Sequence, residues 1–347
     1  MPSWGELPIL QDTTLISTVE KFRNPDFVAQ NEIFTTRVPL DGPVAEWDVL
    51  GWARRKAGFV SYDAPALKVE VMPVDHKSAR VAKVFLKKEL DGNTLAWLRE
   101  PGTEHHKAAE DKIARELEDL NRQVDYLVEY ACWQALTGTL TVSQSAADAP
   151  MQQVQFTVDY GLSNSHTFEI TTATNDWDEA DANILTDTTD GLPAIQRLTR
   201  EDAGLELARC YTNETVQSYL LNNTQVKGFF GERLKTELLE AGYIRQIRGI
   251  AFRQHDFGYV DASGTFHKFI ADEKAIFLPA TNEHFELHEA PAMIPDGQGG
   301  LKRVPGGKYA YAQVQYDPPG VTLFVGYNFL PVCRFPDAWV YADVKST

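Results

Sequence analysis

The sequence predicts an α+β fold built around one long helix. Three observations support this prediction: apolar residues recur every three or four positions between residues 103 and 137, two alternating segments follow them, and helix and strand patterns alternate between residues 182 and 279. With 347 residues and a hydrophobic fraction of 43%, the chain has enough apolar side chains for a core shared by two lobes.

Composition and charge exclude several classes of function. The formal net charge of -16 disfavours binding to DNA, because a phosphate backbone attracts basic surfaces. Three widely spaced cysteines, Cys132, Cys210 and Cys333, match neither a disulfide framework nor a metal motif. No apolar run is long enough to span a bilayer, and the N-terminus lacks a signal-peptide pattern. We therefore expect a soluble protein made inside the cell, without membrane attachment.

Residues 1–45 hold several prolines and one short helical pattern at residues 14–22, which predicts an N-terminal arm lying on another surface. The next segment, residues 46–95, is basic and aromatic within an acidic chain. Its alternation predicts an extended hairpin with strands at 67–72 and 81–86 and a turn at 74–78, docked on an acidic surface. Stacking on single-stranded nucleic acid is the less favoured alternative, because no base-stacking platform accompanies the basic residues.

The long helix is expected over residues 103–137, with Thr103 as a candidate cap and Gly138 as a left-handed end. Its predicted buried stripe consists of Ala109, Ile113, Leu117, Leu120, Val124, Leu127, Ala131 and Ala135. Two strands, at residues 140–142 and 154–158, should follow the helix as an antiparallel pair.

The remaining chain predicts a lobe of mixed helices and strands followed by returning strands. Helices are expected at residues 193–199, 213–222 and 231–242, and strands at 205–211, 244–252, 257–266 and 274–278, with a turn at 261–264. Returning strands are expected at residues 285–289, 310–316 and 321–329.

Searches for catalytic motifs give no site. The glycine-rich residues 296–300 lack the flanking strand, helix and lysine of a phosphate-binding loop, and no Gly-x-Ser-x-Gly motif is present. A metal-dependent hydrolase that uses His267, His284 and His288 is an alternative, and it requires the three imidazoles to converge. We expect no catalytic residue, no cofactor and no metal site.

Three short motifs, in this order, resemble a known family. They are Ala-Leu-Thr-Gly-Thr-Leu at residues 135–140, the segment at residues 154–161 ending in Val-Asp-Tyr-Gly, and Phe-Ile-Ala-Asp-Glu-Lys-Ala-Ile at residues 269–276. With the order of predicted elements, they resemble the lambda-type major capsid protein E family of tailed phages, which has the HK97-like fold. One position departs from the family pattern, because Ala271 replaces the proline that ends the family's turn.

The resemblance implies an organisation in five parts: an N-terminal arm (1–45), an E-loop hairpin (46–95), a peripheral domain with its spine helix (96–181), an axial domain (182–280) and returning peripheral strands (281–347). It also implies a structural protein without enzymatic activity, in which basic hairpin residues contact neighbouring subunits. The candidate contact residues are Arg54, Arg55, Lys56, Lys68, Arg80 and Lys83.

As a phage major capsid protein, the chain would form pentamers and hexamers that build an icosahedral shell, the capsid of the virion, after synthesis in the host cytoplasm. Its partners would be copies of itself, scaffold, portal and decoration proteins, and packaged double-stranded DNA bound without sequence specificity. An encapsulin-like cellular compartment, which has the same fold, is the related alternative.

Overall fold

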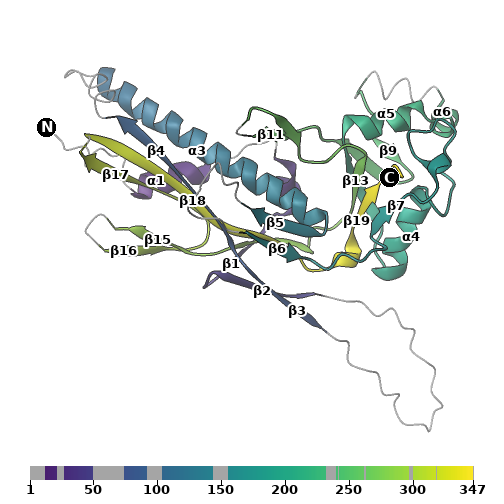
Figure 1. Cartoon of the computed structure of the whole chain (residues 1–347), viewed down its shortest axis with the longest axis horizontal. Helices are drawn as coiled ribbons and strands as arrows, with labels where there is room; N and C mark the ends of the chain where they lie inside the picture. The colour runs from purple at the N-terminus through teal and green to yellow at the C-terminus, as the bar shows by residue number, and fades with distance from the viewer. Residues whose placement is uncertain are drawn as a thin grey trace, which may run out of the picture. The chain divides into compact units, whose positions relative to one another are not determined.

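The computed structural model describes residues 12–21, 27–49, 74–91, 104–143, 155–231, 240, 242–261, 263–296, 300–317 and 319–346. The chain divides into two compact units, and it passes between them several times. Unit 1 comprises Met1–Glu46, Ser78–Cys132 and Phe285–Val332, and unit 2 comprises Trp47–Lys77, Trp133–His284 and Cys333–Thr347. Helices and strands are mixed along the chain, as the α+β prediction requires (Figure 1).

Unit 1 contains a five-stranded sheet with the order β1-β14-β18-β17, in which β4 also pairs with β18. Its strands are β1 (Thr36–Pro39), β4 (Ala82–Asp91), β14 (Phe285–Glu289), β17 (Lys308–Tyr316) and β18 (Pro319–Cys333). The long strand β18 is antiparallel to both β17 and β4, whereas β1 is parallel to β14. The N-terminal helix α1 (Asp12–Lys21) packs against β17.

The long helix α3 (Glu104–Leu136) confirms the main sequence prediction, and Figure 1 shows it running alongside β4 and β18. Most of the predicted stripe is buried, but Leu127 is 44% exposed, so its assignment to the stripe was wrong. The buried sector of the helix is rotated towards three polar residues, Asn121, Asp125 and Glu129, all of which are buried. A pattern based on hydrophobicity alone assigns polar residues to the solvent-facing side of a helix. It therefore misses the buried polar residues and assigns Leu127 to the wrong side.

The buried polar residues of α3 have specific partners in unit 1. The Glu129 carboxylate accepts hydrogen bonds from the backbone N–H groups of Ala29 (2.8 Å) and Gln30 (3.0 Å), in the short π-helix η3 (Ala29–Ile33). The carboxylate of Asp125 forms an ion pair with Lys308 of β17. These contacts join the N-terminal segment and the sheet to the helix.

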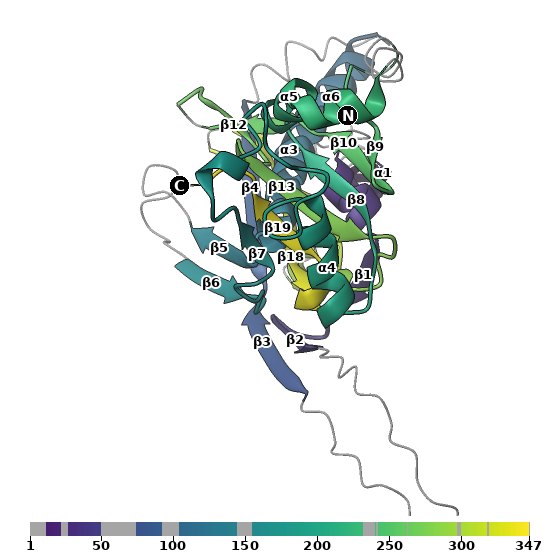
Figure 2. The ribbon, with the colours of Figure 1, turned by 90° about the vertical axis from the view of Figure 1, so that its right-hand side faces the viewer.

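Unit 2 contains a six-stranded sheet with the order β7-β19-β13-β8-β10-β9. Its strands are β7 (Thr167–Glu169), β8 (Leu207–Thr212), β9 (Gln246–Ile247), β10 (Ile250–Gln254), β13 (Lys274–Pro279) and β19 (Val340–Asp343). Figure 2 shows the helices α4 (Leu192–Asp202), α5 (Glu214–Asn222) and α6 (Thr224–Phe230) beside these strands. The core of the unit includes Trp177, Phe252 and Phe277. Short 3-10 turns lie at η4 (Ala173–Asn175) and η5 (Pro336–Ala338).

Four two-stranded pairs complete the described elements. They are β2 (Val44–Val49) with β3 (Asp75–Arg80), β5 (Thr139–Ser143) with β6 (Gln155–Asp159), β11 (Gly258–Val260) with β12 (Phe266–Lys268), and β15 (Ala292–Pro295) with β16 (Leu301–Val304). The pair β5–β6 confirms the strand pair predicted after the long helix. The strand predicted at residues 257–266 with a turn at 261–264 is present as β11 and β12, which pair with each other. No helix among the described residues is long and apolar enough to cross a membrane.

The predicted turn at residues 74–78 is wrong. Residues 75–80 form strand β3, which pairs with β2, and the predicted partner strand at 67–72 lies outside the described residues. The other predicted hairpin strand is present as β4, but it pairs with β18 over residues 82–91. A single alternating pattern shows that a segment is extended and does not show which strand it pairs with.

Candidate functional site

The structure describes two of the six candidate contact residues. Arg80 ends β3 and Lys83 lies near the start of β4, and both side chains are exposed. Within the described residues neither forms an ion pair or a hydrogen bond, although the Lys83 ammonium lies 5.0 Å from the centre of the Phe85 ring. The other four, Arg54, Arg55, Lys56 and Lys68, lie outside the described residues.

Alternation along β4 separates its lysines onto two faces of the sheet. Lys88 points to α3, where it forms ion pairs with Glu116 and with Asp119 (3.1 Å), and these hydrogen bonds raise the pKa of its ammonium. Lys87 points to the opposite face and is bound by Glu89 at 2.8 Å. Lys83 shares the face of Lys87 without such a partner among the described residues, so its charge remains available to another molecule.

The same face of the unit 1 sheet carries a group of stacked rings, which we call the aromatic face: Phe85, Tyr309, Tyr311 and Phe324. The Phe85 ring is 43% exposed and stacks on Phe324 at 5.5 Å, and Tyr311 stacks on Phe324 at 4.6 Å between ring centres. Burial raises the pKa of Tyr309 from its ordinary value of 10 to about 12.

A glycine makes room for the aromatic face. Gly326 of β18 lies opposite both Phe85 of β4 and Tyr309 of β17. A Cβ atom at Gly326 would lie within 2.4 Å of the Tyr309 ring. Sequence reasoning missed this surface, because the rings come from three separate segments whose register is set only in the folded sheet.

The three histidines of the hydrolase alternative do not form a common site. His267 bonds Asp261 at 2.9 Å, the buried His288 bonds Glu286 at 3.0 Å, and His284 contacts an aromatic ring. In the part of the chain that the structure describes, no three His, Cys, Asp or Glu side chains are grouped as metal ligands. The convergence that a metal-dependent hydrolase needs is therefore not found there.

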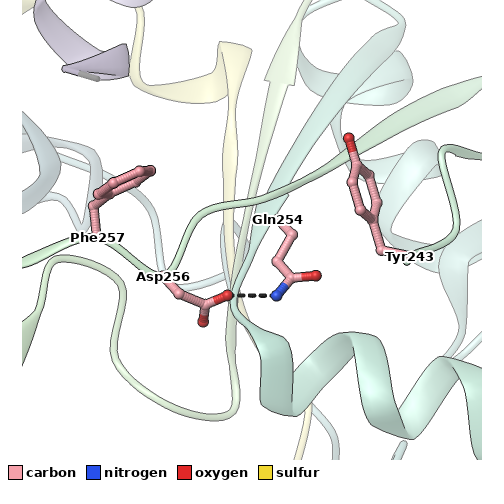
Figure 3. A pocket seen from close by; sticks show the side chains of 4 residues that line it. All are labelled: Tyr243, Gln254, Asp256 and Phe257. Carbon is pink, nitrogen blue, oxygen red and sulfur yellow. Dashed lines mark hydrogen bonds between the residues drawn. The ribbon is translucent and has the colours of Figure 1, made fainter. Parts of the chain in front are cut away.

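One open hollow in unit 2, of about 390 Å³, is lined by Tyr243, Gln254, Asp256 and Phe257 (Figure 3). Its polar groups already serve the fold. The amide of Gln254 donates to the Asp256 carboxylate at 2.6 Å, and the same carboxylate accepts the backbone N–H of Glu214 at the start of α5. Its four described lining residues do not form an arrangement of acid, base and nucleophile.

Comparison with solved structures identifies the fold. A putative capsid protein of a prophage from E. coli CFT073 has a TM-score of 0.64 at 11% identity, covering 96% of this chain and 99% of that chain. A phage-related protein from Bordetella bronchiseptica RB50 has a TM-score of 0.52 at 10% identity, covering 96% and 97%. A chain from Gordonia phage Cozz has a TM-score of 0.51 at 13% identity, covering 99% and 96%. The fold is the HK97-like fold of phage capsid proteins, as the sequence motifs predicted.

Comparison with protein families identifies the family. No curated protein sequence matches the chain. The family model described as phage major capsid protein E matches residues 13–344, a range that covers most of both units and all three motifs. The chain therefore belongs to the phage major capsid protein E family.

Proposed function

We propose that this capsid protein assembles with copies of itself into pentamers and hexamers, which form the icosahedral shell of a virion around phage double-stranded DNA. The observation that carries the proposal is the family match over residues 13–344, nearly the whole chain. The role is structural, with no catalysis and no cofactor. No observation in the described residues favours the encapsulin-like or the hydrolase alternative.

The five-part organisation predicted from the sequence is part of this proposal. Residues 1–45 are the arm, 46–95 the E-loop hairpin, 96–181 the peripheral domain with its spine helix, 182–280 the axial domain, and 281–347 the returning peripheral strands. The 33-residue helix α3 and the paired strands β2 and β3 support the assignments of the spine helix and of the hairpin base.

Contacts between subunits in this proposal combine the basic hairpin residues with the aromatic face. Exposed Arg80 and Lys83 have no acidic partner among the described residues, while the net charge of -16 leaves many carboxylates for them on a neighbouring copy. The exposed Phe85 beside Lys83 adds apolar area to the same surface. A contact between two different surfaces of identical chains is head-to-tail, and it closes into a ring when the rotation between neighbours divides a full turn.

The acidic character of the chain also fits the packaging of DNA. An inner wall that carries net negative charge does not hold the phosphate backbone, whereas a basic wall binds it through release of counterions. Scaffold, portal and decoration proteins are further partners in this proposal, and synthesis takes place in the host cytoplasm before assembly.

Light scattering after size-exclusion chromatography, together with negative-stain electron microscopy, tests the proposal. The purified chain should form rings of five and six subunits or closed shells. A protein that remains monomeric at high concentration, with and without its phage scaffold, would contradict the proposal.

Charge reversal tests the contact residues. The double substitution Arg80→Glu and Lys83→Glu should lower the assembled fraction by about tenfold or more, because like charges across an interface cost several kcal/mol. The charge exchange Lys87→Glu with Glu89→Lys is the matched control: it lies on the same face of the same strand, but it keeps an ion pair within the subunit and leaves the net charge unchanged. Circular dichroism should show both variants folded. Normal assembly of the double variant would remove Arg80 and Lys83 from the interface.

A further inference from the structure

Strand β2 is held by Tyr160, which follows β6 directly in the Val-Asp-Tyr-Gly motif at residues 158–161. Burial alternates along β2, with Ala45 and Trp47 buried and their neighbours exposed. The Trp47 ring, 3% exposed, packs on the fully buried ring of Tyr160, with 6.2 Å between ring centres. A large apolar side chain of β2 is thus anchored on the residue that directly follows β6 in unit 2.

Strand β3 is held by Asp159 and Gly161 of the same motif. The Lys77 ammonium of β3 donates a hydrogen bond to the backbone carbonyl of Asp159 at 3.0 Å. Gly161 has a φ of 78°, and a Cβ atom there would lie 2.7 Å from the Lys77 nitrogen. Any other residue would be strained by this positive φ, and its Cβ atom would displace the lysine side chain. The carboxylate of Asp159 accepts the Gly161 N–H at 2.7 Å and so stabilises this turn.

The motif is also tied to the end of α3. The Tyr160 N–H donates to the carbonyl of Gly138, the residue that ends the helix, at 3.0 Å. Gly138 has a φ of 94°, and a Cβ atom there would lie 2.8 Å from the Leu162 side chain. Two residues earlier, the indole N–H of Trp339 donates to the carbonyl of Leu136 at 2.9 Å. A continuous set of contacts therefore joins the helix end to the β2–β3 pair.

We propose that residues 159–161 are a positioning seat, which sets the direction of the β2–β3 pair relative to the end of α3 and so presents this pair to the neighbouring subunit. Trp47 and Lys77 are the positioning residues, one on each strand. The presentation to a neighbour rests on the proposed function, whereas the seat itself is a property of one chain. Without the seat the strands remain paired with each other, but their direction is no longer set.

Distance measurement between two spin labels tests the seat within one chain. Labels attached after Val74→Cys and Glu179→Cys report on the hairpin base and on unit 2, since both positions are exposed in unit 2 and the three native cysteines are buried. The parent chain should give a narrow distance distribution. Trp47→Ala and Lys77→Met should each lose this narrow peak in favour of a broad distribution.

Two variants of the same strand serve as controls. Trp47→Phe keeps an aromatic ring on Tyr160 and loses no hydrogen bond, because the indole N–H of Trp47 has no partner among the described residues. Asp48→Ala removes only the exposed contact of 2.9 Å to His76 inside the hairpin. Both variants should keep the narrow distribution. A broad distribution for Asp48→Ala would overturn the assignment of the seat to residues 159–161.

Assembly of the same variants tests the role of the seat. Trp47→Ala and Lys77→Met should lose shells and rings while circular dichroism remains that of the parent, and Trp47→Phe should restore assembly. If the parent assembles and these variants keep both the narrow distribution and normal particles, the seat is refuted and the proposed function stands. If the parent does not assemble, the proposed function fails, and the distances still decide whether the seat exists. If Trp47→Ala does not fold, Lys77→Met decides.

Discussion

Acidification should destabilise unit 2 through a single buried imidazole, that of His255. The residue is 2% exposed, and its ring lies 5.0 Å from Trp133 and 5.3 Å from Phe257, measured between ring centres. Burial among aromatic side chains disfavours the imidazolium and lowers the pKa to about 4, and the neighbouring carboxylate of Asp256 opposes this shift only partly. His255 is thus neutral in the folded protein over most of the acidic range.

The sign and the size of the effect follow from proton linkage. The pKa of His255 is lowered on folding from 6.5 to about 4, so the unfolded chain binds a proton that the folded chain does not bind. The stabilisation is present above pH 6.5 and is lost as the pH falls from there to about 4. At 1.36 kcal/mol per pKa unit, the loss between pH 7 and pH 4 is about 3 kcal/mol. That is a large part of the ~5 to 15 kcal/mol by which native proteins are stable.

Urea unfolding followed by tryptophan fluorescence measures this loss, since Trp133 contacts the imidazole. His255→Phe keeps a ring in the stack and removes the titrating group, and other groups titrate equally in both proteins. The free energy of unfolding of the parent should therefore fall by about 3 kcal/mol more than that of the variant between pH 7 and pH 4. Parallel pH profiles of the two proteins would refute the argument, as would an NMR titration of His255 with a pKa near 6.5 in the folded protein.

Two further predictions concern stability, each measured by urea unfolding. Glu129→Ala should cost about 2 to 6 kcal/mol, because it leaves two backbone N–H groups of η3 buried without acceptors. Glu118→Ala, at a half-exposed position of the same helix, should cost under about 1 kcal/mol. Equal losses would contradict the bonds assigned to Glu129. Asn213→Ala should cost about 1 to 2 kcal/mol, because its side chain caps α5 through the Val216 N–H at 3.1 Å. Asn222→Ala, at an exposed position at the other end of α5, is its control. Equal stability of the two variants would show that the Asn213 cap does not stabilise the protein.

Elements with a strong local signal were predicted from the sequence within a few residues. The helix expected at residues 103–137 is α3 (Glu104–Leu136), and it ends at Gly138 in the left-handed conformation. The helix expected at residues 213–222 is α5 (Glu214–Asn222), and Asn213 caps its first turn. Periodicity and caps depend on residues within one or two turns of each other, so a single sequence contains them.

Predictions that required a choice of partner strand were less successful. The strand expected at residues 244–252 is interrupted by a turn at Arg248 and Gly249, both with positive φ, and becomes β9 and β10. The turn expected at residues 74–78 is absent, because residues 75–80 form β3 and pair with β2. Their sequence, Asp-His-Lys-Ser-Ala-Arg, has little β-propensity, and the tertiary contact of Lys77 with Asp159 holds it extended.

For the candidate contact surface, the sequence predicted the basic residues but not their neighbours in the folded sheet. Basic residues such as Lys83 stand out in an acidic sequence, so the sequence alone identified them as candidates. The sequence did not show that Phe85 stacks beside Lys83, because the stack depends on rings from β17 and β18. It also did not show that Lys88 is neutralised by α3, since the pairing joins residues 31 positions apart.

By itself, the sequence determined the long helix, the strand pair that follows it, the basic character of the hairpin segment, and the family through motifs such as Val-Asp-Tyr-Gly at residues 158–161. Only the tertiary structure decided what this motif does: Tyr160 contacts Trp47, which lies 113 positions earlier, and Gly161 leaves room for Lys77, which lies 84 positions earlier. It also decided that His255 is buried and neutral. The physical reason is that helix periodicity is a local property of the chain, whereas burial, register and pKa shifts depend on residues brought together from distant segments.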